Sequence, residues 1–463
     1  MDALDTPGTL ADISRPFTFA VIGDTHYSHP KFYPDLEQSP ASRRPLAIEK
    51  YIENVDYVLT PMMEALQESS PSFIVLTGDL VEGSRNEGLA REEMKAGLDY
   101  FESYGIPVFL ARGNHDAVQV FNEVAMPRVA ERLGWVPEET YYFWDVAGCR
   151  LVFLDTGAWI SQGRQSRWLD DLLRRGRELG IDRTFVFGHH PIWPAARAFF
   201  THVDLARELA PTLGRCAADG YFCGHTHNQS ILLHRTTDRP VLQLMGAPIG
   251  LPEEIPTPLD RVQGSLPGPD QLLAQWPGYL ENTAPGWFTV TVGDAAVRAD
   301  WHHLNRGPET SVVWRQPGDL LRLSRLEHPP DARLITADLS HIRRAFLRFC
   351  AWDASGDTKR VLLNGVDVGS LPAGSDFSSR RMELPASAVG TLSMVNRLEV
   401  QPVKDEKSTL GNLLMEVVLP GGRVARTRPT GQIQTWSNEW DVWDQPMQKL
   451  RPLQPVVEDL SFW

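Results

Sequence analysis

Five short polar segments recur in the first half of this 463-residue chain, and each directly follows a short apolar run that is typical of a buried strand. In α/β proteins the carboxyl ends of neighbouring parallel strands open onto one crevice, so polar side chains that follow such strands converge there. The alternation therefore predicts a layered α/β domain with one polar centre. The segments are Asp24-Thr25-His26, Gly78-Asp79, Gly113-Asn114-His115-Asp116, Gly188-His189-His190 and Gly224-His225-Thr226-His227.

The side chains that these segments bring together are of the types that bind metal ions. Two carboxylates, one amide and at least four imidazoles are expected to meet at one point. This mixture of nitrogen and oxygen donors suits Mn, Fe, Zn or Co better than Mg or Ca alone. Seven ligands are too many for one ion, and they favour two ions that share a carboxylate.

The order of the segments matches the signature of the calcineurin-like metallophosphoesterases, which is D-x-H, G-D, G-N-H-(D/E), H and G-H-x-H. The chain resembles this family over residues 17–301. The resemblance implies an α/β fold of four layers (αββα), with two mixed sheets flanked by helices. It also implies two transition metal ions, Mn, Fe or Zn, of which one is held by Asp24, His26 and His227, the other by Asn114, His189 and His225, and both by Asp79.

The same resemblance implies hydrolysis of a phosphoester by a metal-bridging hydroxide. His115 is then expected to face the substrate and to assist the leaving oxygen. Such an imidazole needs an orienting carboxylate, for which Glu82 is preferred and Asp116 is the alternative. The imidazole two residues before a proline ligates in this family, so His189 is expected to be the ligand and His190 a hydrogen-bonding neighbour. Tyr27, Arg85 and Asn86 follow ligand-bearing segments and are either substrate contacts or solvated loop residues.

Two departures narrow the expected substrate to a phosphodiester or a small phosphomonoester. Purple acid phosphatases have D-x-G and a tyrosinate where this chain has His26 and Glu82. Phosphoprotein phosphatases have an arginine where this chain has Gly83. The alternative function is a non-catalytic scaffold that binds a partner or a glycan on the same fold. Scaffolds of this kind usually lose ligands or the His of G-N-H, and this chain has lost none.

Composition limits the partners and the compartment. The formal net charge of −14 disfavours nucleic acid as the main partner. No signal sequence and no membrane-spanning apolar run is visible, so we expect no membrane association. The four cysteines have no spacing typical of a metal site or a disulfide framework. A cytoplasmic protein is therefore expected, unless a signal has been removed.

The patterns divide the chain into a catalytic domain over residues 1–301, a connector over 302–332 and a β-sandwich over 333–463 with a Trp-rich tail. Helices are expected near 47–68, 87–104, 118–133, 164–179 and 203–213. Residues 247–285 are rich in Pro and Gly and are expected to form a long functional loop near the metal side. Short β runs with an Asn364-Gly365 turn predict the second domain, which is similar to galactose-binding-like jelly rolls and is a candidate surface for a homo-oligomer.

Overall fold

The computed structural model describes most of the chain and leaves defined gaps. The described residues are 13–34, 48, 51–52, 54–157, 163–192, 204–227, 229–234, 236, 238–246, 272–281, 285–304, 307–315, 320–325, 334–353, 359–371, 379–401, 408–420, 424–427, 434–436 and 455–462. The greater part of the predicted 247–285 loop and of the Trp-rich tail therefore lies outside the described residues.

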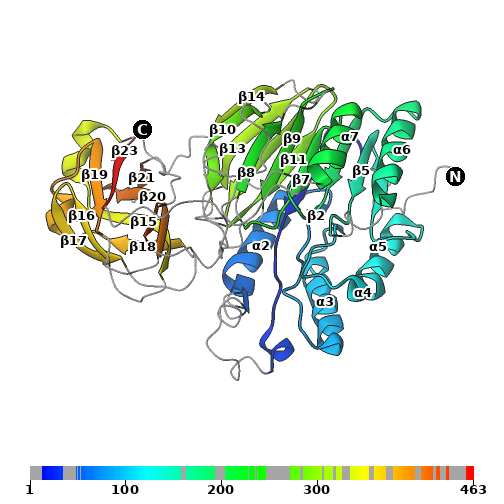
Figure 1. Ribbon diagram of the computed structural model, residues 1–463, viewed down its shortest axis with the longest axis horizontal. Coiled ribbons are helices and arrows are strands. Elements are labelled where there is room, and N and C mark those ends of the chain that lie inside the picture. Colours follow the sequence, from blue (N-terminus) through cyan, green and yellow to red (C-terminus); the bar gives the residue numbers. More distant parts are fainter. Residues whose placement is uncertain are drawn as a thin grey trace.

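Two seven-stranded mixed sheets form the centre of the first domain (Figure 1). The first sheet has the order β14-β13-β12-β11-β1-β2-β3, and its strands are β1 (Phe17–Ile22), β2 (Ile74–Leu76), β3 (Val108–Leu110), β11 (Gly286–Val292), β12 (Val297–His303), β13 (Gly307–Trp314) and β14 (Leu320–Arg325). The second has the order β10-β8-β9-β7-β6-β5-β4, and its strands are β4 (Tyr142–Val146), β5 (Cys149–Phe153), β6 (Arg183–Phe187), β7 (Gly220–Cys223), β8 (Gln229–His234), β9 (Val241–Gly246) and β10 (Leu272–Glu281). In each sheet the strands that precede the polar segments are parallel neighbours, namely β1, β2 and β3 in one and β6 and β7 in the other.

Helices occur in all five regions where they were expected. They are η3 (Val55–Leu59), α2 (Thr60–Ser69), α3 (Glu87–Glu102), α4 (Val118–Val120), η4 (Phe121–Ala125), α5 (Met126–Leu133), α6 (Arg164–Glu178), η6 (Leu205–Leu209) and α7 (Ala210–Arg215), with a short 3-10 turn η1 at Pro30–Phe32. The apolar sides of α6 and α7 pack on Val152, Leu154 and Val186, which alternate with the residues that face the first sheet. The predicted four-layer arrangement is therefore confirmed.

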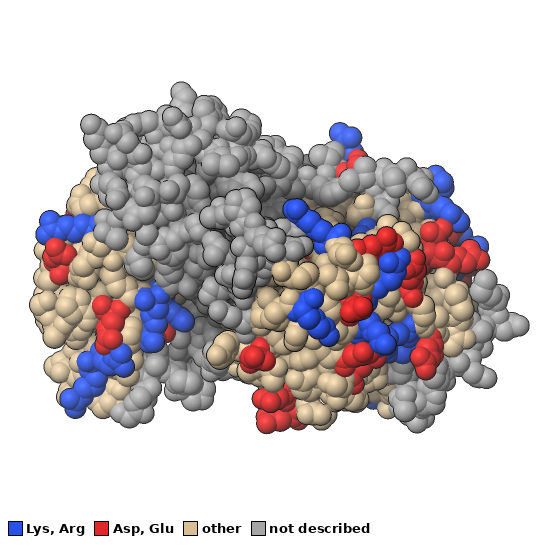
Figure 2. All heavy atoms as spheres, turned by 90° about the horizontal axis from the view of Figure 1, so that it is seen from below, with Lys and Arg blue, Asp and Glu red and all other residues tan. Residues whose placement is uncertain are grey.

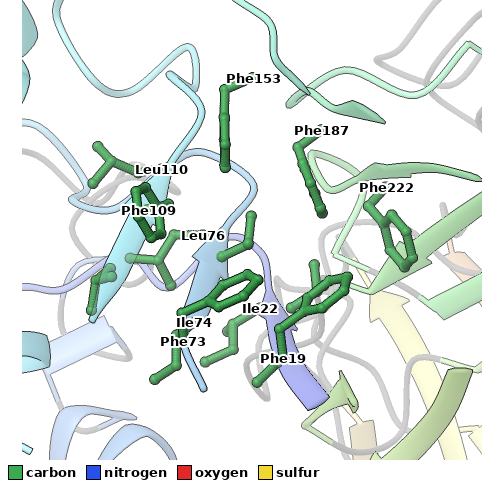
Figure 3. Close-up of a cluster of buried hydrophobic side chains, with 14 of the residues drawn as sticks. Phe19, Ile22, Phe73, Ile74, Leu76, Phe109, Leu110, Phe153, Phe187 and Phe222 are labelled. Atoms are coloured by element: carbon green, nitrogen blue, oxygen red, sulfur yellow. The ribbon is translucent and has the colours of Figure 1, made fainter. Parts of the chain in front are cut away.

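Aromatic side chains from both sheets form the core between them (Figure 3). Phe19 of β1 stacks on Phe73 at 5.1 Å between ring centroids and meets Phe185 and Phe187 of β6 edge-on at 5.6 and 6.0 Å. All four rings are fully buried. Their packing fixes the two sheets against each other, and with them the strand ends that carry the polar segments.

Two predictions about the segments that flank this core were wrong. The expected connector contains β13 and β14, which pair antiparallel with β12 and with each other, so the first domain extends past residue 301. The expected long loop contains β10, which pairs with β8 at the edge of the second sheet. Val312 and Trp314 are buried, which shows that the alternating apolar pattern of β13 is a sheet signal despite the Pro and Gly around it.

The second domain is the predicted β-sandwich. One sheet has the order β18-β15-β20-β21 with β22 also paired to β20, and the other has the order β17-β16-β19-β23. Its elements are η8 (Thr336–His341), β15 (Arg344–Asp353), β16 (Lys359–Leu363), β17 (Val366–Leu371), β18 (Ser379–Glu383), α8 (Ala386–Val389), β19 (Val395–Val400), β20 (Ser408–Val418), β21 (Val424–Arg426), β22 (Gln434–Trp436) and β23 (Val456–Ser461). Asn364 and Gly365 join β16 to β17 with φ of 52° and 81°, which is the backbone that a tight Asn-Gly hairpin turn requires.

The described surface is mixed in charge. On the face in Figure 2, Lys and Arg side chains lie among Asp and Glu side chains rather than in one basic field. Many of them are paired, as in the contact of Arg91 with Glu87 and Glu123. Within the described part of the chain, no helix is long and apolar enough to cross a membrane.

Candidate metal centre

The polar segments adopt a strained backbone at the strand ends. Among the described non-glycine residues with positive φ are five of the predicted ligands: Asp24, His26, Asp79, His225 and His227. Left-handed backbone is rare for such residues and is concentrated at functional sites. The loops that hold it are tied together, because the His26 amide donates to the Asp79 carbonyl at 2.9 Å and the Gly224 amide donates to the His189 carbonyl at 2.9 Å.

Two glycines allow the close approach of the loops. A Cβ at Gly113 would lie 2.1 Å from Oδ1 of Asp79, and a Cβ at Gly224 would lie 2.1 Å from Oδ2 of Asp24. Any side chain at either place would displace a carboxylate. These glycines are therefore required by the packing of the site itself.

The first predicted ligand group is assembled. Asp24, His26 and His227 are buried, and their ligand atoms lie within 4.8 Å of one another. Nε2 of His26 lies 3.0 Å from Nε2 of His227, which in turn lies 3.4 Å from Oδ1 of Asp24. Asp24 is oriented by the His225 amide, which donates to both carboxylate oxygens at 2.8 and 2.9 Å.

The second predicted group is assembled beside it. Nε2 of His189 lies 2.9 Å from Oδ1 of Asn114 and 3.2 Å from Nδ1 of His225. Burial, and then the neighbouring imidazoles of His189 and His190, hold the pKa of His225 well below its ordinary value. His225 is therefore a neutral imidazole, which is the form that binds metal.

Asp79 lies between the two groups. Its Oδ2 is 3.7 Å from Nε2 of His26 and 3.2 Å from Nε2 of His189, while its Oδ1 accepts from the His115 amide at 2.8 Å. Burial alone would raise the pKa of this carboxyl, but the surrounding imidazoles, His189 first, hold it well below its ordinary range. One ionised oxygen thus faces both ligand groups, as the predicted bridge requires.

The hydrogen bonds around these groups leave lone pairs on ring nitrogens that face the middle of the site. Nδ1 of His189 lies 3.0 Å from the Thr77 carbonyl, which can only accept, so Nδ1 carries the hydrogen and a neutral His189 has its lone pair on Nε2. That lone pair faces the oxygens of Asn114 and Asp79. In the same way Nδ1 of His26 donates to Glu82 at 3.0 Å and leaves a lone pair on its Nε2. Converging acceptors need a cation between them, so the residues present suit two metal ions.

His115 lies at the rim of this centre. Its Nδ1 lies 2.8 Å from the Glu82 carbonyl and 3.1 Å from the Glu82 carboxylate, so it donates to Glu82. Burial lowers the pKa of His115, but the contact with Glu82 and the charge of Asp79 outweigh it and raise the pKa to about 11. The same contacts with His115 and His26 lower the pKa of Glu82 to about 2 against the effect of burial. One carboxylate therefore orients both a ligand imidazole and the rim imidazole.

Three of the other predicted site residues make contacts within the fold, and the predicted substrate contacts of Asn86 and Tyr27 stay predictions. The Asp116 carboxylate accepts from the amides of Gly113, Leu80 and Val81 at 2.9, 3.3 and 3.4 Å, so it fixes the loops and is not the partner of His115. Asn86 caps α3 by accepting from the Leu89 amide at 3.1 Å. Tyr27 is half-buried and packs on Tyr100 at 5.3 Å. Arg85 is exposed, and its contact with the substrate stays a prediction.

The prediction missed a buried support for the Gly113–Asp116 loop. Arg112 makes a two-pronged contact with Asp155, at 2.8 Å for both pairs of atoms, and donates to the carbonyls of Gly113 and Asp116 at 3.0 Å. Asp155 also accepts from Thr140 at 2.6 Å. A signal was present, since Asp155-Thr156 follows the apolar run of β5 and Leu154 in the same way that the five recognised segments follow their strands.

Comparison with known proteins gives a family and several distant folds. The family model described as calcineurin-like phosphoesterase matches residues 17–229. No curated protein sequence matches the chain. One similar solved structure is GAP50, the anchor in the inner membrane complex of Plasmodium, with 14% identity over 67% of this chain and 89% of that chain and a TM-score of 0.42. Another is a dimetal phosphatase from Danio rerio, with 14% identity over 62% of this chain and 97% of that chain and a TM-score of 0.41. A purple acid phosphatase from yellow lupin, Lupinus luteus, is also similar, with 11% identity over 64% of this chain and 52% of that chain and a TM-score of 0.43.

The family match spans all five strands that lead to the site, and it includes every residue of the two ligand groups. The sequence signature, the order of the strands and the family model agree. Residues 17–229 of this chain therefore match the calcineurin-like phosphoesterase family.

Proposed function

We propose that this protein hydrolyses a phosphodiester or a small phosphomonoester at a dinuclear metal centre. The observation that carries the proposal is the position of Asp79, whose Oδ2 faces both ligand groups at 3.7 and 3.2 Å. When bound, two metal ions in such a site polarise the phosphoryl oxygens and lower the pKa of a water to near neutrality. The nitrogen and oxygen donors favour Mn, Fe or Zn as the ions.

The proposed site has metal ligands, a carboxylate that orients one of them and a contact for the substrate. Asp24, His26 and His227 would hold one ion, Asn114, His189 and His225 the other, and Asp79 both. Glu82 keeps His26 in the tautomer that offers Nε2 to the metal. Exposed Arg85, three residues after Glu82, is the proposed contact for the charged group of the substrate.

His115 is the proposed donor to the leaving oxygen. Because its Nδ1 hydrogen is used by Glu82, the Nε2 end is the one available to a substrate. The high pKa of His115 keeps that nitrogen protonated at neutral pH, with metal charge offsetting part of the increase. An imidazolium at this rim can protonate an alkoxide as it leaves. The alternative scaffold function has no support of this kind, since the described site retains each ligand and the rim imidazole.

The experiment is a leaving-group series on the metal-reconstituted protein. For His115→Ala, we expect unchanged metal content and a kcat lower by about 10²–10⁴ on alkyl esters, the usual contribution of a general acid. The loss should be much smaller on nitrophenyl esters, whose leaving group needs little protonation. His341→Ala, an exposed imidazole of η8 in the second domain, is the control. A wild-type protein with two bound metals and no activity on any ester would refute the proposal.

A further inference from the structure

His190 lies beside the predicted metal ligands, and neither the two ligand groups nor the rim position of His115 gives it a role. A ring nitrogen of His190 lies within 4.8 Å of ring nitrogens of His189 and His225. Its ring centroid is 4.5 Å from that of His225 and 5.0 Å from that of His189. By distance alone, His190 could be a further metal ligand. The hydrogen bonds of its neighbour Thr156 decide against this.

The Thr156 hydroxyl fixes the tautomer of His190. Its Oγ1 lies 3.2 Å from the His189 amide, 3.0 Å from the His190 amide and 2.9 Å from Nδ1 of His190. The two amides can only donate, and they occupy both lone pairs of the hydroxyl oxygen. The hydroxyl therefore donates its own hydrogen bond to Nδ1 of His190, which accepts it with a lone pair. A neutral His190 therefore carries its hydrogen on Nε2.

The backbone of His190 is also held in place. The phenol of Tyr221 donates to the His190 carbonyl at 2.6 Å. Tyr221 and Thr156 are both fully buried, and burial raises the pKa of Tyr221 well above its ordinary value, so it remains a donor. A Cβ at Gly188 would lie 2.6 Å from Oη of Tyr221 and 2.7 Å from Cγ2 of Thr156, so the glycine makes this arrangement possible.

His189 and His190 differ in which ring nitrogen carries the hydrogen. His189 gives its Nδ1 hydrogen to the Thr77 carbonyl and offers a lone pair on Nε2, as a metal ligand must. Nδ1 of His190 accepts a hydrogen bond from the Thr156 hydroxyl, so its Nε2 carries a hydrogen and cannot coordinate a metal. The predicted ligand His189 is fully buried, whereas His190 beside it is only partly buried.

We propose that His190 is a hydrogen-bond donor to a phosphoryl oxygen of the substrate, held in that tautomer by Thr156 and in that position by Tyr221. This inference rests on the proposed phosphoesterase function and adds a substrate contact to it. A phosphoryl oxygen is an anionic acceptor, and hydrogen bonds to charged acceptors contribute about 10- to 100-fold in affinity.

The test measures metal content and phosphate affinity separately, with inorganic phosphate as the probe. After reconstitution, His190→Ala should hold as many metal equivalents per chain as wild type, by elemental analysis. Its Kd for phosphate, by titration calorimetry, should be about 10-fold higher or more. Thr156→Ser, which keeps the hydroxyl, should bind phosphate like wild type, and Thr156→Val should resemble His190→Ala. His341→Ala, far along the sequence and exposed, should change neither quantity.

Loss of metal in His190→Ala would make His190 a ligand and overturn the inference, and so would unchanged phosphate affinity with full metal content. A long-range ¹H–¹⁵N spectrum of the ¹⁵N-His protein reads the tautomer without any assay of activity, and a hydrogen on Nδ1 of His190 would also overturn it. If wild type binds phosphate but hydrolyses no ester, the proposed function fails while the role of His190 in anion binding stands. If wild type is active and His190→Ala binds phosphate equally well, only the inference about His190 fails.

Discussion

At the scale of single residues, Asp79 is the position on which the centre depends. Its two oxygens have different partners, since Oδ2 faces His26 and His189 while Oδ1 accepts from the His115 amide. Its backbone is left-handed, with φ of 51°, a conformation that costs about 1 kcal/mol or more and persists only where the surroundings impose it. The residue is therefore tied to both ligand groups and to the loop that carries the rim imidazole.

We expect Asp79→Asn to lower the occupancy of both metal positions, because it removes the negative charge that they share. His26→Ala should lower mainly one, because its Nε2 lies in the group of Asp24 and His227 and meets the second group only through the shared Asp79. Titration of each variant with Mn or Zn, followed by elemental analysis, compares the two. Two full equivalents retained by Asp79→Asn at wild-type affinity would contradict a bridging role.

At the scale of elements, a buried carboxylate joins α3 to the loop after β2 that carries Glu82. Glu93 on α3 is fully buried, accepts from the Ser84 amide at 2.8 Å and contacts the hydroxyl of Tyr33. Burial raises the pKa of Glu93 to about 7, with a smaller contribution from the charge of Glu82, while the contacts with Tyr33 and Ser84 partly oppose the increase. The protonation of Glu93 is thus linked to how firmly this loop is held.

This pKa predicts a pH-dependent stability. Between the ordinary value of 4.5 and about 7, the folded state binds more protons at Glu93 than the unfolded state, so this residue lowers stability as pH rises through that window. Glu93→Gln removes the effect. Its free energy of unfolding relative to wild type should rise by up to about 3 kcal/mol between pH 4.5 and 7 and then level off. Urea unfolding at several pH values measures this, and a constant difference would show that Glu93 titrates normally.

At the scale of the whole molecule, the first sheet is completed by strands that lie beyond the family match. β13 and β14 cover the edge of β12, and Val312 and Trp314 of β13 are buried in the first domain. The Arg183 side chain, from the start of β6, contacts both Asp219 at 2.9 Å and the Arg315 carbonyl. These contacts join β13 to the second sheet as well as to the first.

We expect a protein shortened to residues 1–330 to remain soluble and to bind two metals. A protein shortened to residues 1–303 should aggregate, because it leaves β12 as an uncovered edge and removes the buried Trp314. Size-exclusion chromatography with metal analysis of both proteins compares them. Equal solubility and metal content of the shorter protein would mean that β13 and β14 are dispensable.

The sequence by itself determined the chemistry of the centre. Each ligand directly follows an apolar run, and a strand of this kind brings its carboxyl end to the same edge of a sheet as its parallel neighbours. The donor set could therefore be predicted without knowledge of any contact. The helices of the first domain and the Asn364-Gly365 hairpin were predictable for the same reason, since their signals are local.

Only the tertiary structure decided how these side chains are used. The sequence favoured Glu82 over Asp116 as the partner of His115 but left both open. The contacts separate them, because backbone amides donate to Asp116 and two imidazoles contact Glu82. The tautomers of His189 and His190 depend on the Thr77 carbonyl and the Thr156 hydroxyl, which are 112 and 34 residues away. The pairing of β13 with β12 was likewise not predicted, because the Pro and Gly residues around β13 are typical of a loop. Such roles follow from partners that only the folded chain brings together, so no local pattern can encode them.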